Sequence, residues 1–277
     1  MKKIRTLSQR SPIVFSVAVC VLTFLCMRGV AWLSQFFPGT DRNLILLEYE
    51  IVGILWPVAL ALLFGYGFMF RMKGFRSTLV AGLPSLAART LLLLITIVSA
   101  VSAGAQWRTL PTMLVGVVAM IGVGVREEVI FRGVIGNALA LKYAKNSKGL
   151  WFTAIVAAAL FSAIHLQNLL VGVGLTAMVT QLIGAFGMGL VLVVVYLRGG
   201  NIWVPILIHA IVDASGLFDS SFVVTTKTVV DDISKLSLGG TLIMLVIHIA
   251  LCIFLLRKSK QPAIFARLEA LRKELQL

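Results

Sequence analysis

Residues 111–141, PTMLVGVVAMIGVGVREEVIFRGVIGNALAL, decide the fold. A run this long and apolar is typical of a transmembrane helix, which needs about 20 apolar residues to cross the hydrocarbon core. The run nevertheless contains Glu127, Glu128 and Arg132. A charged side chain at the middle of a bilayer costs roughly 2.5 to 3.5 kcal/mol on insertion scales. Such residues line a cavity, pair with each other or carry out a reaction.

The composition indicates a polytopic membrane protein. Of the 277 residues, 59% are hydrophobic and 13% charged, and the mean hydropathy is +1.00, which excludes a soluble domain of useful size. The net charge of +14 does not predict a nucleic acid partner, because Lys and Arg cluster at the ends of apolar runs. The cysteines lie in apolar segments without C-x-x-C spacing and indicate neither disulfides nor a thiolate metal site: Cys20, Cys26 and Cys252.

Eight apolar segments approach the length of a membrane span, so we predict an all-α polytopic membrane bundle of about eight transmembrane helices. An even number of crossings places both termini on one side. Basic residues precede the first segment and follow the second, fourth and eighth, which predicts cytosolic termini by the positive-inside rule. The segments are 13–33, 51–70, 79–103, 111–141, 150–167, 173–197, 202–218 and 239–256.

A basic stretch precedes the first apolar segment, and an amphipathic pattern follows the last one. A basic start before an apolar run resembles a signal peptide, but no small-residue cleavage site follows, so the first segment is expected to be an uncleaved helix. After the last segment, Ile264, Leu268 and Leu275 recur at helical spacing among Arg and Lys. This pattern predicts a short amphipathic helix on the anionic cytosolic leaflet, where it contacts membrane lipid. A solvated helical tail is the alternative.

The first motif is the run Glu127-Glu128-Val-Ile-Phe-Arg132. Positions i and i+4 share a helical face, so Glu128 is expected to form an ion pair with Arg132 that makes both charges tolerable. Glu127 then lies about 100° around the helix without a partner in this segment. A carboxyl group in such a position can take a proton from water and return it. The alternative places both glutamates at a helix end in the headgroup region.

Two further motifs pair residues at i and i+4: Phe161 with His165, and His209 with Asp213. A carboxylate one turn from an imidazole can accept its N–H and fix its tautomer, whether the histidine binds metal or acts as a base. Either histidine alone is more typical of a buried structural residue than of a catalytic one, and it is their combination with two glutamates that indicates a reactive site. His248 has no acidic residue at i±4 and is assigned no role.

The expected depths allow one common site. At 1.5 Å per helical residue, Glu127 lies about 20 Å, His165 about 22 Å and His209 about 12 Å from the cytosolic boundary. Glycines flank this region and would let helices approach closely. They are Gly116, Gly122 and Gly124 in the fourth segment, and Gly184, Gly187 and Gly189 in the sixth.

These motifs, in this order on successive apolar helices, resemble those of the CPBP family of intramembrane proteases, also called the CAAX protease and bacteriocin-processing or Abi family. The resemblance spans about residues 111–218. It implies a hydrolase that cuts a peptide bond in a membrane peptide or a lipid-modified protein. It also implies three parts of the chain: N-terminal helices over 1–110, a catalytic core over 111–218, and the last helix with a basic tail over 219–277.

The resemblance implies roles for individual residues. Glu127 would activate water together with His165, while His209 and residue 213 would stabilise the oxyanion. Residue 213 is Asp here, and because an ionised Asp cannot donate a hydrogen bond, it would be protonated, orient His209 or help hold a metal. The family has been described both as metalloproteases and as glutamate-dependent proteases. A zinc ion held by Glu127, His165 and His209 is therefore possible, and a metal-free mechanism is equally open.

Other functions stay open at this point. A non-catalytic bacteriocin-immunity factor or membrane scaffold would use the same helices for packing alone. A proton-coupled transporter would use the carboxylates as a relay, although the sequence has neither repeats nor paired Gly/Pro-interrupted helices in two halves. The resemblance and the short basic loops predict a multi-pass protein of a bacterial plasma membrane.

Overall fold

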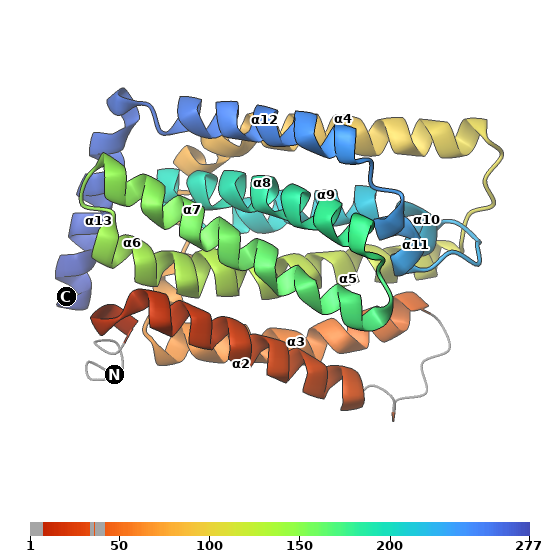
Figure 1. Cartoon of the computed structure of the whole chain (residues 1–277), viewed down its shortest axis with the longest axis horizontal. Helices are drawn as coiled ribbons and strands as arrows, with labels where there is room; N and C mark the ends of the chain where they lie inside the picture. Colours follow the sequence, from red (N-terminus) through yellow and green to blue (C-terminus); the bar gives the residue numbers. More distant parts are fainter. Residues whose placement is uncertain (1–7, 34–35, 37–41) are drawn as a thin grey trace.

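A computed structural model of the chain describes residues 8–33, 36 and 42–277. Within these residues the chain is helical, apart from turns and an isolated β bridge between Trp107 and Val223, so the predicted all-α membrane bundle is confirmed. The long helices lie side by side along the long axis of the molecule (Figure 1). The elements are α2 Pro12–Leu33, α3 Arg42–Leu63, η2 Gly67–Phe70, α4 Phe75–Ser102, α5 Leu110–Glu128, η3 Val129–Gly136, α6 Asn137–Tyr143, α7 Ser147–Ile164, η4 His165–Val171, α8 Leu175–Gly199, α9 Trp203–Gly216, α10 Phe218–Phe222, α11 Val229–Ser234, α12 Leu238–Leu255, η5 Lys258–Lys260 and α13 Gln261–Leu275.

All eight predicted segments are helical, but not all of them form a single apolar α-helix long enough to cross a membrane. Among the described residues, six helices are long and apolar enough to cross a membrane. The seventh segment, α9, has only 14 residues and is shorter than the hydrocarbon core. The fourth is a continuous helical run from Leu110 to Tyr143 that carries the charged motif in its interior.

The second helix differs from its prediction. It was expected over 51–70, whereas α3 begins at Arg42, ends at Leu63 and is followed by a turn at Gly65, where φ is 74°. The expected start at residue 51 left Glu50 outside the helix, and an acidic residue is unfavourable inside an apolar span unless it is paired. Glu50 is instead buried inside the bundle and paired with an arginine of α5. An internal ion pair thus lets the helix begin nine residues earlier.

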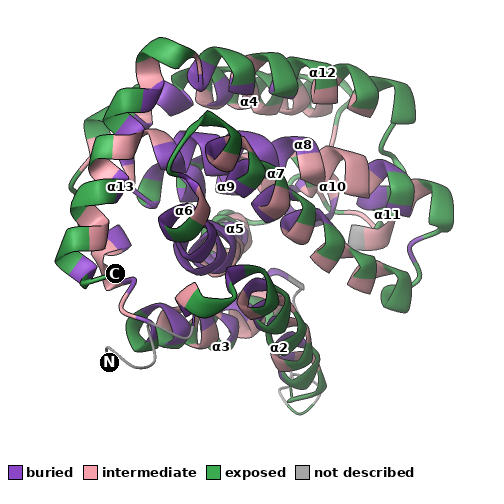
Figure 2. Ribbon diagram, turned by 60° about the vertical axis from the view of Figure 1, so that its left-hand side comes forward, coloured by how far each residue is buried: buried purple, intermediate pink, exposed green. Residues whose placement is uncertain are grey.

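The fourth predicted span changes its helical geometry at the motif. After Glu128, the residues of η3 adopt π-helical hydrogen bonding before α6 resumes the α-helix. Such segments are rare and occur mainly at functional sites. Every residue of η3 is buried, as are residues 190–197 of α8, and Figure 2 shows these buried positions in the middle of the bundle. The best-packed core therefore begins directly beside the glutamates.

Glycines bring neighbouring helices close to this region, as expected. A Cβ at Gly122 would lie 2.9 Å from the Cβ of Glu50, and one at Gly124 would lie 3.0 Å from the carbonyl oxygen of Ile206. Gly189 allows an equally close contact between α8 and the ring of Phe161. The missing side chains let α3 and α9 approach α5, and α8 approach α7, at short distances.

The C-terminal tail forms the predicted amphipathic helix, α13, but its apolar face has a different partner. Ile264 and Leu268 are fully buried against the bundle instead of being left for lipid or solvent. Arg272 donates hydrogen bonds to the carbonyls of Leu141, Ala140 and Ala144, and Arg267 donates to that of Leu197. These carbonyls lie at the C-terminal ends of α6 and α8, where most carbonyl groups lack an intrahelical donor. α13 therefore closes one end of the bundle.

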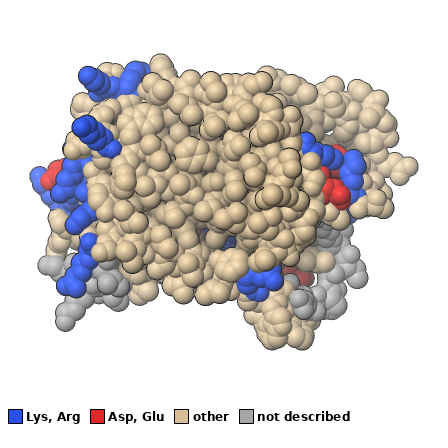
Figure 3. All heavy atoms as spheres, in the orientation of Figure 1, with Lys and Arg blue, Asp and Glu red and all other residues tan. Residues whose placement is uncertain are grey.

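Basic side chains gather at this same end, as Figure 3 shows. They come from the turns between α3 and α4 and between α6 and α7, and from α13 and the residues before it. The predicted N-terminal basic residues Lys2, Lys3 and Arg5 lie outside the described residues. The basic residues that the structure places at this end include Arg71, Lys73, Arg76, Lys142, Lys145, Lys148, Arg257, Lys258 and Lys260.

The close contact at Gly189 predicts a stability difference between two glycines of α8. Gly189→Val forces a Cβ to 2.9 Å from the Phe161 ring and 3.3 Å from the Ala158 backbone, and overpacking of this kind costs about 1–3 kcal/mol. Gly184→Val is the matched control, because a Cβ there meets only Thr241 at 3.5 Å. Thermal unfolding of the purified variants should show a loss for Gly189→Val alone. Equal unfolding temperatures would contradict this packing.

Candidate active site

Glu127 and Glu128 end α5, and the helix continues through them into η3. They therefore lie in the interior of a helical run, not at the helix end considered as the alternative. Glu128 is fully buried and forms the predicted ion pair with Arg132, with 2.8 Å between Oε1 and Nη1. The same oxygen accepts a hydrogen bond of 2.6 Å from Nδ1 of His209 on α9. Glu128 thus joins two helices and is enclosed by its partners.

Glu127 has a partner that the sequence prediction missed. Its Oε1 lies 3.2 Å from Nη2 of Arg126, the preceding residue, so the expectation of an unpaired carboxylate in this segment is wrong. Arg126 also binds Glu50 through two hydrogen bonds of 2.7 and 3.1 Å. This bidentate arrangement is the geometry that favours a guanidinium–carboxylate pair. Oε2 of Glu127 remains directed toward His209, at 3.7 Å from Nε2.

His165 is held by the backbone of its own motif. Its Nδ1 donates a hydrogen bond of 2.9 Å to the carbonyl oxygen of Phe161, one turn earlier. Because a carbonyl can only accept, Nδ1 carries the proton, and Nε2 of the neutral ring has a free lone pair. That nitrogen can accept a proton or bind an electrophile, which is the property expected of a base.

The ring of Phe161 contacts three side chains of the site. Its centroid lies 5.1 Å from that of His165 and 5.8 Å from that of His209, both in edge-to-face geometry. The guanidinium of Arg132 lies 4.3 Å from the same ring, a cation–π contact in a buried environment. Phe161 therefore packs against both histidines and fixes the arginine that pairs with Glu128.

Asp213 does not form the hydrogen bond to His209 that the i, i+4 spacing allows. Its Oδ2 is 3.7 Å from Nε2 of His209, too far for a hydrogen bond, and no hydrogen-bond partner for this oxygen lies among the described residues. The carboxylate that accepts the imidazole N–H and orients the ring is Glu128, contributed by another helix. Asp213 instead places a second carboxylate oxygen near Nε2.

A cavity of about 520 Å³ connects these residues. Glu127, His165 and Asp213 line it, together with Glu50 and Arg126. Its other walls come from α2, η4, α8 and α11 and mix apolar side chains with amides. The cavity has the size of small-ligand sites in proteins, which are about 300–1,000 Å³. The charged cluster therefore faces a space that can take a short stretch of substrate.

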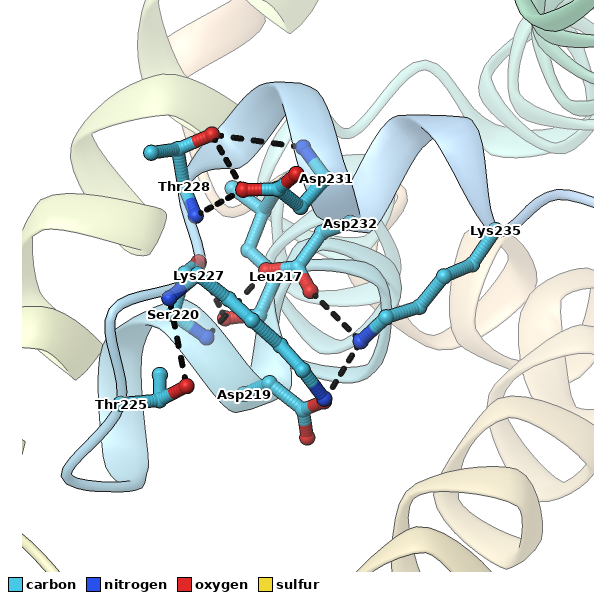
Figure 4. A network of polar contacts seen from close by, with 9 residues as sticks. All are labelled: Leu217, Asp219, Ser220, Thr225, Lys227, Thr228, Asp231, Asp232 and Lys235. Atoms are coloured by element: carbon cyan, nitrogen blue, oxygen red, sulfur yellow. Dashed lines mark hydrogen bonds and ion pairs between the residues drawn. The ribbon is translucent and has the colours of Figure 1, made fainter.

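The mouth of this cavity is braced by a polar network on the segment that joins α9 to α12 (Figure 4). Lys235 and Lys227 both bind Asp219, at 2.5 and 2.9 Å, and hydrogen bonding to their ammonium groups lowers the pKa of this carboxyl. Lys235 also reaches Asp232, which accepts a hydrogen bond from the backbone of Ser220. These contacts hold α10 and α11 together.

His248 lies outside the cluster but is not isolated. Its Nε2 accepts a hydrogen bond of 2.7 Å from Arg89 of α4, and Gly187 provides the space beside its ring. This pair links α12 to α4. The signal for it, an arginine in the middle of the apolar segment 79–103, was present in the sequence but had no partner at helical spacing.

Residues 108–215 match the family model of type II CAAX prenyl endopeptidase Rce1-like proteins. This segment is similar to the CAAX protease family. The matched segment contains all three motifs, from Glu127 to Asp213, so the resemblance stated above is confirmed. A CAAX protease is an intramembrane endopeptidase that acts on membrane-associated or prenylated proteins. No curated protein and no solved structure matches the chain significantly.

The donor atoms of the candidate site do not fit a zinc ion as they lie. Zinc takes three or four ligands at about 2 Å from a common point. Among the described residues, no group of three His, Cys, Asp or Glu side chains has that arrangement, and Nδ1 of His209 is already bound to Glu128. Zinc binding by Glu127, His165 and His209 would require these side chains to move closer together, and the proposed reaction does not depend on it.

The buried ion pair predicts non-additive stability effects. Arg126→Met leaves Glu50 buried without its counter-charge, and breaking a buried pair costs about 3–5 kcal/mol. Adding Glu50→Leu removes that unpaired charge, so the double variant should unfold at a higher temperature than Arg126→Met alone. Thermal unfolding in detergent measures this. Simple addition of the two single effects would show that the residues do not interact.

The donor geometry also predicts the metal content. Purified protein should contain zinc well below one ion per chain by elemental mass spectrometry, and the value should not change in His165→Ala. One zinc per chain that is lost in this variant would mean that the side chains rearrange around a metal.

Proposed function

We propose that this protein hydrolyses a peptide bond within the membrane, with Glu127 and His165 activating a water molecule. The observation that carries the proposal is that both side chains line one cavity inside the helix bundle, beside an imidazole held by a buried carboxylate. The match of residues 108–215 to the CAAX protease family supports this reaction class. The residue roles follow from which atoms are engaged and which are free.

The first step is attack of water on the substrate carbonyl carbon. Arg126 engages Oε1 of Glu127 and compensates its charge, which leaves Oε2 to accept a proton from the water. Nε2 of His165, with its free lone pair, accepts the second hydrogen bond of the water and orients it. The new bond joins the water oxygen to the carbonyl carbon, and the carbonyl oxygen becomes an oxyanion.

His209 is placed to stabilise that oxyanion. Its Nδ1–H is bound to Glu128, and its Nε2 faces oxygens of Glu127 and Asp213 at 3.7 Å each. Two carboxylate oxygens around this nitrogen favour an N–H over a lone pair, so Nε2 can donate to the oxyanion. Collapse of the intermediate breaks the C–N bond, and the leaving nitrogen takes the proton held by Glu127. Asp213 acts as a positioning residue that supplies counter-charge to His209.

The reaction is expected to take place in a bacterial plasma membrane. The chain is a multi-pass membrane protein, and we infer a bacterial plasma membrane with both termini in the cytosol, because basic side chains gather at the end closed by α13. The substrate is a membrane peptide or a lipid-anchored protein whose scissile segment reaches the cavity from the surrounding membrane.

Substitution of the two water-activating residues should abolish hydrolysis. Glu127→Gln and His165→Gln each remove a proton acceptor, and loss of a general base lowers kcat by about 10²–10⁴-fold. The measurement is cleavage of a panel of internally quenched membrane peptides, including a farnesylated one, by protein in detergent. The matched controls are Glu48→Gln and His248→Gln, which change the same residue types away from the cavity.

The variants should have the same elution volume in size-exclusion chromatography and the same unfolding temperature as the parent protein. A loss of activity can then be assigned to the substituted side chain and not to misfolding. Full turnover by both Glu127→Gln and His165→Gln would overturn the assignment of water activation to these residues. Absence of cleavage by the parent protein would favour the non-catalytic immunity or scaffold function.

The third motif predicts graded losses. His209→Ala removes an oxyanion donor, which costs about 10²–10³-fold in kcat. Asp213→Asn keeps the shape but removes a counter-charge next to His209, and outer partners of this kind are worth about 10–100-fold. Steady-state kinetics on the same peptides measures both. Higher activity in Asp213→Asn would instead assign residue 213 to direct contact with the oxyanion.

A further inference from the structure

The cavity at the site extends toward only one end of the bundle. From Glu127 it passes Asn168 and Val171 of η4 and reaches Arg28 of α2. Its outer wall is formed by Ile233 of α11 and by Leu236, which follows that helix. In Figure 1, α10 and α11 lie at the end opposite to α13. The route from the catalytic residues to the outside therefore leads away from the basic end.

The opposite direction is sealed. Beyond Glu128, the residues of η3 and residues 190–197 of α8 are buried throughout, and α13 lies across the helix ends that follow. A pocket of about 90 Å³ is present at this end, between Arg71 and Arg267, but no residue of the site lines it. A second pocket at Glu127, between α2 and η3, has a free volume of only about 10 Å³, too little for a peptide. Among the described residues, the cavity large enough for a substrate therefore lies on the side away from the basic end.

The charges assign the two ends to the two sides of a membrane. Lys and Arg concentrate in the short turns of the sealed end, and such loops remain in the cytosol. We propose that the active site opens to the non-cytosolic side and that its substrate is a polypeptide segment exposed there, either exported or anchored in the outer leaflet. This inference rests on the proposed function and names the substrate class for the same site.

The cavity wall suits an extended peptide. Nδ2 of Asn168 donates a hydrogen bond of 3.0 Å to Oε1 of Gln181, and both residues line the cavity between the site and its mouth. This bond leaves Oδ1 of Asn168 and Nε2 of Gln181 to pair with the C=O and N–H groups of a peptide backbone. The mouth also exposes apolar Val171 and Leu236, which suits a segment that arrives along the membrane surface.

Hydrolysis at this site would follow translocation of the substrate across the membrane. A segment made in the cytosol must first be translocated across the membrane, so a translocation step supplies this substrate and hydrolysis follows it. A protein whose modified end stays on the cytosolic leaflet would meet the sealed end of the bundle. The substrate class therefore differs from a cytosolic prenylated protein.

Thiol labelling tests the direction of access. In a background with Cys20, Cys26 and Cys252 changed to Ala, Val171→Cys marks the mouth and Lys148→Cys marks the basic end; both positions are exposed. A membrane-impermeant maleimide should label Val171→Cys in intact cells and Lys148→Cys only after permeabilisation. Leu236→Cys is a second mouth variant should Val171→Cys fail to fold. The reverse labelling pattern would overturn the inference.

Vesicles test the sidedness of the reaction itself. The peptide panel, added to right-side-out vesicles that contain the parent protein, should be cleaved, whereas inverted vesicles should cleave only after detergent is added. Cleavage by intact inverted vesicles alone would overturn the inference and leave the hydrolase proposal in place. If detergent-solubilised protein cleaves no peptide, the proposed function fails, and the labelling pattern still decides which way the cavity opens.

Discussion

Charge compensation inside an apolar bundle is the constraint on which this structure depends. A carboxylate or guanidinium in hydrocarbon is tolerated only when an opposite charge or hydrogen-bonding partner is supplied by the protein. Here Glu50 of α3 pairs with Arg126, Arg126 with Glu127, and Glu128 with both Arg132 and His209. These contacts tie three separate helices around the same few residues. Glycines on α5 make the short distances between those helices possible.

The two adjacent glutamates are used differently because their surroundings differ. Glu128 is fully buried, and its bound oxygen is shared by an arginine and an imidazole, so it can hold the site together but cannot meet a substrate. Glu127 shares one oxygen with Arg126 and faces the cavity with the other. The change to π-helical geometry directly after the pair accompanies this division, and Phe161 keeps both histidines beside it. Two consecutive residues thus have different roles: Glu128 holds the helices together, and Glu127 faces the cavity.

Hydrophobic length and helical spacing were sufficient to predict the order of the helices and the Glu128–Arg132 pair, because these depend on contacts within one segment. Partners from other segments were not predictable from spacing. Glu50 was placed before its helix, and Arg126 was given no role. Orienting His209 was one of three roles considered for Asp213, whereas Glu128 makes that hydrogen bond. The docking of α13 was missed for the same reason, since its apolar face is compatible with lipid or with protein. Local periodicity shows which face is apolar but not what covers it.

The most direct measurement is an experimental map of the protein in a lipid nanodisc at a resolution that resolves side chains. The account predicts His209 between the two glutamates, with Nδ1 bonded to Glu128 and Nε2 within about 4 Å of Glu127, and a cavity beside them. A map with Glu127 and Glu128 directed toward lipid, or with His165 and His209 on opposite faces of the bundle, would contradict it.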